Sequence, residues 1–264
     1  MKKVDVLIAV PTYDRKIYIE TSKSITNTII ALMQEKASGH LVSISSCAFI
    51  SHARNFLVHD FIARKEKTHL LFVDADMEWS PHTILRLLRA NVPVAAAPYV
   101  AKSYRNQLPR GQHYRDVDMT HAATVNWNIQ LENPAMMTGE QKLSPLNQGF
   151  TKVLRVGAGL LLLRRDCIET MIRKYSDTGY YWVNVGDENE KGKNERYFGL
   201  FNTMLDENNV FIGEDYSFCD RWVKGCGGEI WCDVDARVAH HGHHRYSGSL
   251  QESLRLRAKP REGS

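Results

Sequence analysis

The sequence places two aspartates one residue apart, directly after an apolar run. Asp74 and Asp76 follow residues 70–73, which are all apolar, as in a strand that is buried on both faces. Residues i and i+2 of an extended chain point the same way, so both carboxylates face a common point. Two like charges this close repel each other unless a positive charge lies between or beside them. The pair therefore predicts a bound cation or a basic neighbour.

Two further groups of titratable side chains could act together with this pair. Glu214 and Asp215 lie at the expected start of a helix, where acidic side chains are favourable and where they could also act as an acid or a base. A histidine cluster near the C-terminal end consists of His240, His241, His243 and His244. Carboxylate oxygens and one imidazole, with room for diphosphate oxygens, form a ligand set that suits Mn²⁺ or Mg²⁺. Such a cation would let Asp74 and Asp76 face each other.

Strands and helices alternate along the first hundred residues or so. Apolar runs predict strands at 4–10, 41–45, 70–73 and 92–100. Apolar residues at helical spacing predict helices at 25–33, 52–62 and 81–88, with Ser51 and Ser80 as N-caps of the last two. This alternation predicts an α/β fold with a mostly parallel central sheet flanked by helices. Ligands of such sheets bind beyond the carboxyl ends of strands, where Asp74 and Asp76 lie.

The second half of the sequence is less regular. Residues 103–150 show poor periodicity and many Pro, Gly and Asn residues, so we expect a long excursion with little regular structure there, which is functional or mobile. Order returns with a strand segment at 153–166, whose last residue, Asp166, is expected to cap the helix that follows. A second irregular piece at 186–199 precedes a helix that begins at the acids and stops at Gly225. No repeat or linker is visible, which favours a single domain.

Composition limits the class of protein. Hydrophobic residues make up 43% and charged residues 24%, as in soluble globular proteins, and no apolar run is long enough to cross a membrane. Asp5 interrupts the apolar N-terminal run and no small-residue cleavage site follows, which favours a first strand over a signal peptide and a cytoplasmic location. The five cysteines lack paired spacing, which favours a reducing compartment.

The net charge of +4 is unevenly distributed. Residues 79–115, here called the acid-free stretch, contain no Asp or Glu but do contain Arg86, Arg89, Lys102, Arg105, Arg110 and Arg115. The C-terminal tail at 251–264 adds Arg255, Arg257, Lys259 and Arg261. We interpret the tail as a frayed, solvated segment. The acid-free stretch is either a solvated basic face or a site for an anionic ligand near the two aspartates.

Seven short blocks follow one another in a characteristic order. They are IAVPTYD (8–14), SHARNFLVHDF (51–61), LLFVDADMEWSPHTILRLL (70–88), PYVAK (98–102), VGAGLLLLRR (156–165), GEDYSFCDRWVKGCGGEIW (213–231) and AHHGHHRYSG (239–248). In this order they resemble the nucleotide-sugar-dependent glycosyltransferases of the GT-A fold, and more narrowly a bacterial and phage subgroup. The resemblance implies one GT-A domain over 1–264, with a nucleotide-sugar-binding half at 1–102, an acceptor and catalytic half at 103–250 and a basic tail at 251–264.

The resemblance also implies an activity. The protein would be a metal-dependent, hexosyltransferase-like enzyme that moves a sugar from a UDP- or GDP-sugar to a hydroxyl acceptor, with a saccharide as the expected acceptor. The nucleoside pocket would be lined by Pro11, Thr12 and Tyr13. Arg54 would contact the base or phosphate, and the glycine turn at 157–159 would let the backbone approach the sugar or acceptor closely.

The metal and the base complete the implied site. Asp74 would meet the ribose or the metal, and Asp76 and His240 would bind Mn²⁺ or Mg²⁺, with His241 as the less favoured substitute for His240. The metal would neutralise charge on the leaving diphosphate, with help from Arg54 or Lys102. In the Glu214–Asp215 pair, Asp215 is the preferred general base for the acceptor hydroxyl.

Other functions compete with this interpretation. A phage-type DNA glycosyltransferase would modify a 5-hydroxymethylpyrimidine flipped out of DNA, and the acid-free stretch would follow phosphates. A metal-dependent phosphohydrolase or nuclease would use the same aspartates and histidines without an acceptor, and an inactive nucleotide-binding module would need neither Glu214 nor Asp215. Aromatic residues that could stack on an acceptor are Tyr114, Trp127, Tyr181 and Trp182.

Overall fold

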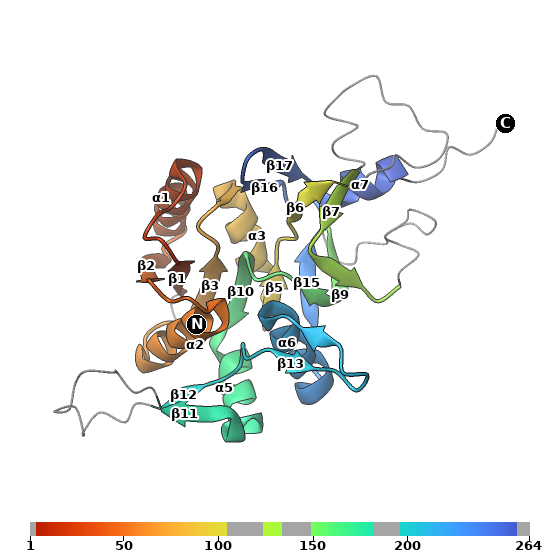
Figure 1. Ribbon diagram of the computed structural model, residues 1–264. Helices are drawn as coiled ribbons and strands as arrows, with labels where there is room; N and C mark the ends of the chain where they lie inside the picture. The colour runs from red at the N-terminus through yellow and green to blue at the C-terminus, as the bar shows by residue number, and fades with distance from the viewer. Residues whose placement is uncertain (1–3, 105–123, 134–148, 182–195, 258–264) are drawn as a thin grey trace.

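The computed structural model describes residues 4–104, 124–133, 149–181 and 196–257 of the chain. In these residues, a central sheet of eight strands has helices on both faces (Figure 1). From one edge to the other the strands are β2 (Ser38–Ser45), β1 (Asp5–Thr12), β3 (His69–Val73), β10 (Leu160–Arg164), β5 (Val94–Ala96), β15 (Ile230–Asp233), β9 (Phe150–Val156) and β8 (Ile129–Leu131). Of these described strands, β9 and β10 run opposite to the other six. The predicted α/β fold class, with a mostly parallel sheet flanked by helices, is confirmed.

The order of the strands was not predicted. The expected strand segment at 153–166 is split by the glycine turn into β9 and β10, which lie at different places in the sheet. The second of them, β10, lies between β3 and β5 and pairs with both in antiparallel fashion. The predicted halves at 1–102 and 103–250 therefore share one sheet.

Side chains of the central strands alternate between two hydrophobic cores, because neighbouring residues of a strand point to opposite faces. One face is covered by α1 (Ile19–Gln34) and α3 (Pro81–Ala90), and the other by α2 (Ile50–Ala63), α5 (Arg165–Lys174) and α6 (Glu214–Asp220). Leu7 packs in the core under α2, and Ile8 packs in the core under α1. Figure 1 shows the two groups of helices above and below the sheet. The continuous apolar runs in the sequence reflect this burial on both faces.

The predicted helix caps have mixed outcomes. Ser80 caps α3 as expected, because its hydroxyl accepts a hydrogen bond from the backbone N–H of His82 at 3.4 Å and proline follows at the first helical position. The prediction for Ser51 is wrong, because α2 begins two residues earlier than expected, at Ile50, and Phe49 occupies the N-cap without a side-chain bond. Asp166 lies inside the first turn of α5 rather than at its N-cap, and its carboxylate accepts from the Cys167 N–H.

The expectation of little regular structure at 103–150 is wrong for the described part of that segment. Strand β7 (Val125–Trp127) pairs with β6 (Val100–Tyr104), and β8 extends the central sheet beside β9. The apolar residues Val125, Trp127, Ile129 and Leu131 are buried and alternate with more exposed polar residues. This period of two is a strand pattern, which the irregular sequence on both sides obscures.

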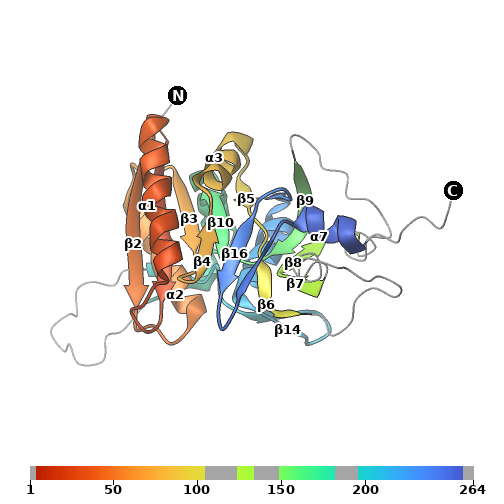
Figure 2. The same cartoon turned by 90° about the horizontal axis from the view of Figure 1, so that it is seen from above.

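A smaller three-stranded sheet brings the C-terminal part of the chain to the two aspartates. It consists of β4 (Met77–Trp79), β16 (Val238–His241) and β17 (Arg245–Gly248), with β16 in the middle. Figure 2 shows β16 beside β4, and His240 pairs with Met77 in their antiparallel register. This pairing places His240 next to the segment that contains Asp76.

The basic tail is not frayed where the structure describes it. Residues up to Arg257 form helix α7 (Leu250–Arg257), in which Leu250 and Leu254 are buried at helical spacing. The Arg257 guanidinium is also buried and donates to the Val125 carbonyl. Burial of the two leucines explains why the tail is ordered here, and residues 258–264 lie outside the described residues.

The remaining described elements are short. They are β11 (Gly179–Tyr181), β12 (Arg196–Phe198), β13 (Met204–Leu205), β14 (Phe211–Ile212), a 3₁₀ turn η2 (Ser176–Thr178) and the π-helical segment η3 (Arg221–Gly225) that continues α6. Of the helices in the described part of the chain, none is both long enough and apolar enough to span a bilayer.

Candidate active site

Each of the two aspartates has its own basic partner. Asp74 follows β3 and accepts a hydrogen bond from Arg54 Nη2 at 2.9 Å through Oδ1. Asp76 precedes β4, and its Oδ2 contacts the ammonium group of Lys102. The positive charge that was predicted beside this pair is therefore supplied by two basic residues of the protein itself, Arg54 and Lys102.

Arg54 connects the aspartate segment to the acidic pair at the start of α6. Its side chain is only 3% exposed, and its Nε lies 3.6 Å from Glu214 Oε1 in an ion pair that is too long for a hydrogen bond. Its Nη1 donates to the Ala158 carbonyl at 3.3 Å, and the guanidinium lies over the Phe72 ring. Burial alone would lower the pKa of Arg54, but the charges of Asp74 and Glu214 outweigh it and raise that pKa.

Asp76 and His240, the two residues that the resemblance implies as metal ligands, lie close together. His240 Nε2 lies 3.3 Å from Asp76 Oδ1. Burial alone would raise the pKa of Asp76, but the hydrogen bonds from His240 and Lys102 outweigh it and lower that pKa. Most of the carboxylate's interactions therefore favour its charged form.

The tautomer of His240 shows that these residues fit a cation. Its Nδ1 lies 2.9 Å from the Val100 carbonyl, which only accepts, so Nδ1 carries a proton. With Nδ1 protonated, Nε2 faces the Asp76 carboxylate, and either a proton on Nε2, which makes the hydrogen bond described above, or a cation lies between these two groups. Metal-bound histidines are held by the same kind of carbonyl contact. Asp76 and His240 thus form a carboxylate–imidazole pair that suits Mn²⁺ or Mg²⁺.

Asp74 is not part of that pair, because Arg54 holds it. Within the described residues, no group of three or more His, Cys, Asp and Glu side chains is close enough to hold a metal ion. A cation between Asp76 and His240 would therefore take its other ligands from a bound molecule and water. The role of Asp74 as a metal or ribose ligand stays a prediction.

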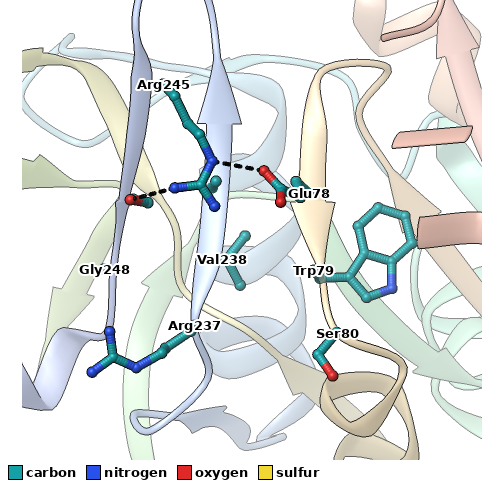
Figure 3. Close-up of a pocket in the computed structure, with 9 residues that line it drawn as sticks. Glu78, Trp79, Ser80, Arg237, Val238, Arg245 and Gly248 are labelled. Carbon is teal, nitrogen blue, oxygen red and sulfur yellow. Dashed lines mark hydrogen bonds and ion pairs between the residues drawn. The ribbon is translucent and has the colours of Figure 1, made fainter. Parts of the chain in front are cut away.

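His241 points away from the Asp76 carboxylate, because neighbouring residues of a strand face opposite sides. Its Nε2 lies 2.9 Å from Glu78 Oε2, and its ring lies 5.5 Å from the Tyr18 ring. A cavity of about 330 Å³ lies beside Glu78, over β4, β16 and β17 (Figure 3). Arg245 donates to Glu78 in this cavity at 2.8 Å. No residue predicted for the site lines it, so this cavity is separate from the Asp76–His240 pair.

Asp215 occupies the first turn of α6, with Gly213 at the N-cap. Its Oδ1 accepts from the Tyr216 N–H at 2.8 Å, and its Oδ2 accepts from Asn128 Nδ2 at 3.3 Å. Burial and the neighbouring charge of Glu214 raise the pKa of Asp215, although these hydrogen bonds and Arg54 work against them. A carboxylate with raised proton affinity suits a general base.

The glycine turn makes room for side chains of the site. A Cβ on Gly157 would lie 2.2 Å from Asn128 Nδ2 and 2.3 Å from the Tyr99 hydroxyl oxygen. A Cβ on Gly159 would lie 2.9 Å from Asp74 Oδ2. The expected close approach of backbone to sugar stays a prediction, whereas the structure shows the glycines accommodating these three side chains.

The predicted nucleoside-pocket residues lie at the carboxyl end of β1, which is next to β3 in the sheet. Pro11 is buried, and the Thr12 hydroxyl donates to the Ile44 carbonyl at 3.3 Å. Tyr13 is 71% exposed and is therefore available for stacking. Because β1 and β3 are parallel neighbours, the carboxyl end of β1 lies on the same side of the sheet as Asp74.

The predicted aromatic platforms are unequal. Trp127 is buried in the core at 8% exposure, whereas Tyr181 is 58% exposed. Tyr114 and Trp182 lie outside the described residues. Two polar residues of the site were missed by the sequence analysis, namely Tyr99 and Asn128. Tyr99 lies within the PYVAK block, and Asn128 lies in the alternating pattern of 125–131, which could have revealed a strand there.

Among known proteins, only the comparison with solved structures gives matches, and their sequence identity is low. No family model matches the chain, and no curated protein matches it in sequence. The chain is similar to the crystal structure of A197 from STIV, with 12% identity and a TM-score of 0.48 over 94% of this chain and 92% of that one. It is also similar to the crystal structure of a glycosyltransferase involved in the glycosylation of the major capsid of PBCV-1, with 8% identity and a TM-score of 0.28 over 61% and 62% of the two chains. Both TM-scores are too low to carry a functional argument.

The architecture is nevertheless informative by itself. The mixed sheet, mostly parallel and covered by helices on both faces, has the architecture of a Rossmann-like α/β fold. Acidic and basic side chains converge at the carboxyl end of β3. The protein is therefore an α/β protein with a polar site beyond the carboxyl ends of its central strands.

Proposed function

We propose that this protein is a glycosyltransferase that moves a sugar from a nucleotide-sugar donor to a hydroxyl acceptor. The observation that carries the proposal is the position of buried Arg54, which contacts both Asp74 and Glu214. Through this contact the segment expected to hold the donor and the segment that contains the candidate base meet at one edge of the sheet. Such a meeting is what transfer between two bound molecules requires.

The donor side is formed by residues at the ends of β1 and β3. Asp76 and His240 would hold a divalent cation, Mn²⁺ or Mg²⁺, which when bound neutralises charge on the leaving diphosphate. Lys102 lies beside Asp76 and adds a positive charge at the same place. Pro11, Thr12 and Tyr13 would bind the nucleoside of a UDP- or GDP-sugar.

The acceptor side depends on Asp215 rather than Glu214. Glu214 is already paired with the Arg54 guanidinium, from which it lies 3.6 Å away, whereas burial raises the pKa of Asp215. Asp215 takes the proton of the acceptor hydroxyl as that oxygen bonds to the anomeric carbon and the bond to the diphosphate oxygen breaks. The proton therefore ends on Asp215, and the electron pair leaves with the nucleotide.

A saccharide is the acceptor we propose, because the described cations of the acid-free stretch are already neutralised. Arg86 binds Asp233 at 2.6 Å, Arg89 binds Glu35 at 2.9 Å, and Lys102 binds Asp76. Paired cations release few counterions on binding a phosphate backbone, so they contribute little to DNA affinity. Arg105, Arg110 and Arg115 lie outside the described residues.

Ligand-dependent thermal stability tests the donor side. A panel of UDP- and GDP-sugars with Mn²⁺ should raise the melting temperature of the wild-type protein, because ligand binding stabilises by mass action. Asp76→Ala should lose the manganese-dependent part of that shift. Asp177→Ala, an exposed aspartate on η2, is the matched control and should keep it.

Transfer itself is tested by incubating donor and Mn²⁺ with and without saccharide acceptors. Sugar should appear on an acceptor only with the wild-type protein, and Asp215→Asn should bind donor but transfer no sugar. Release of phosphate as the main activity without any acceptor would instead identify a phosphohydrolase. Absence of any stabilisation by the whole panel would contradict the proposal.

A further inference from the structure

We propose that Asn128 is a positioning residue that holds the Asp215 carboxylate in place, and that Tyr99 in turn holds Asn128. The side-chain nitrogen of Asn128 lies 3.3 Å from Asp215 Oδ2 and 2.9 Å from the Tyr99 hydroxyl oxygen. This inference rests on the proposed function, because it gives Asp215 its role as base. It adds two residues that the seven blocks do not assign to the chemistry.

The direction of the Asn128 amide follows from its partners. A carboxylate oxygen only accepts hydrogen bonds, so the NH₂ edge of Asn128, and not its carbonyl, faces Asp215. The NH₂ group has two hydrogens, one for Asp215 and one for the Tyr99 oxygen. Both donors of Asn128 are therefore used within the site.

The backbone fixes Asn128 from both sides. Its N–H donates to the Tyr99 carbonyl at 3.1 Å, and its carbonyl accepts from the Gly157 N–H at 2.9 Å. The residue lies between β7 and β8, so two strands restrict its direction. The side chains of Asn128 and Tyr99 pack directly against the Cα of Gly157, because a Cβ at that position would overlap both Asn128 Nδ2 and the Tyr99 oxygen. Asn128 is thus held by Tyr99 and Gly157 before any substrate binds, which is the condition for a positioning role.

The charges around Asp215 explain what a neutral donor achieves there. The groups that affect its ionisation include Glu214, Arg54, Asn128 and the Tyr216 N–H, and burial together with its own charge raises the pKa of Tyr99 and Cys219. Burial and Glu214 disfavour the carboxylate, and a hydrogen bond from Asn128 favours it without neutralising it. A cation in the place of Asn128 would make Asp215 a weaker base. The neutral amide of Asn128 instead orients the Asp215 carboxylate and leaves its negative charge uncompensated.

Titration of Asp215 tests this contact without any substrate. The carboxyl carbon of Asp215 is followed by NMR against pH in the wild type, Asn128→Ala, Asn128→Asp and Tyr99→Phe. Loss of a hydrogen bond to a charged acceptor should raise its proton affinity about tenfold in Asn128→Ala. Asn128→Asp adds a like charge and should raise it further. Tyr99→Phe keeps the ring and should produce a smaller shift in the same direction.

Kinetics then separate positioning from folding. Asn128→Ala should lower kcat about tenfold or more and move the acid limb of the pH profile to higher pH, while the KM for the donor stays unchanged. Asn126→Ala is the matched control, because Asn126 lies two residues away and donates to Ser103 instead. An unshifted Asp215 titration in both Asn128 variants would overturn this inference and leave the proposed function standing. Failure of the wild type to transfer any sugar would overturn the proposed function, whereas the titration would still decide whether Asn128 favours the charged carboxylate.

Discussion

Arg54 illustrates how much of this site depends on single buried charges. Its guanidinium is surrounded by Asp74, Glu214 and the Ala158 carbonyl, and it also packs on two aromatic rings. In the described structure it faces these partners rather than an open surface. Its first effect is therefore to let two acidic segments lie close together, and any contact with a donor phosphate would come in addition.

Replacing Arg54 tests this role at the residue scale. Arg54→Met keeps much of the apolar length but leaves Asp74 and Glu214 without their shared cation, so the free energy of unfolding should fall by about 2–4 kcal/mol. The matched control is Arg89→Met, because Arg89 and Glu35 form a pair in which both side chains are more than half exposed. That variant should lose no more than about 1 kcal/mol. Urea unfolding measures both, and equal losses would contradict the assignment.

At the scale of elements, the small sheet decides which histidine can serve the site. The antiparallel pairing of β16 with β4 sets His240 opposite Met77, next to Asp76. Because side chains alternate along β16, the adjacent His241 contacts Glu78 instead. Two neighbouring and chemically identical side chains therefore have different surroundings.

Manganese binding distinguishes these two histidines. If His240 is a ligand of the proposed cation, His240→Ala should weaken the manganese-dependent binding of donor by about tenfold or more. His241→Ala should change it less than about twofold, within ordinary surface effects. Calorimetric titration of the donor with and without Mn²⁺ provides the measurement. A reversed order of the two effects would identify His241 as the ligand.

At the scale of the whole molecule, the sequence carries a net charge of +4, but the described cations of the acid-free stretch are paired with acidic side chains. The described arginines and the lysine of the acid-free stretch contact acidic partners, and Arg257 of the tail is buried against the Val125 carbonyl. Such a surface offers weak long-range attraction to a polyanion. It suits an acceptor that carries little charge.

Salt dependence tests this conclusion. Transfer to a saccharide should change less than about twofold between about 50 and 200 mM salt, since few counterions are released. A DNA acceptor contacted through six or more phosphates would lose affinity by about a thousandfold over the same range. Duplex DNA that contains a 5-hydroxymethylpyrimidine is the direct competitor in this assay. Sugar transfer to that DNA, with steep salt dependence, would replace the saccharide in our proposal.

Local patterns in the sequence determined the elements of this protein. Apolar runs predicted β1, β3 and the β10 segment, and Ser80-Pro81 predicted the start of α3. The position of Asp74 and Asp76 at the end of a buried strand also followed from neighbouring residues alone. These predictions succeed because strand period, helix period and caps depend on contacts within a few residues.

Only the tertiary structure decided which of these elements meet. The antiparallel insertion of β10 between β3 and β5, the contact of Arg54 with Asp74 and the reach of Asn128 to Asp215 all join residues far apart in the chain. Strand order and side-chain direction set these contacts, and neither is encoded in a local period. For the same reason the candidate acids, bases and histidines could be identified from the sequence, whereas the partner of each is known only from the tertiary structure.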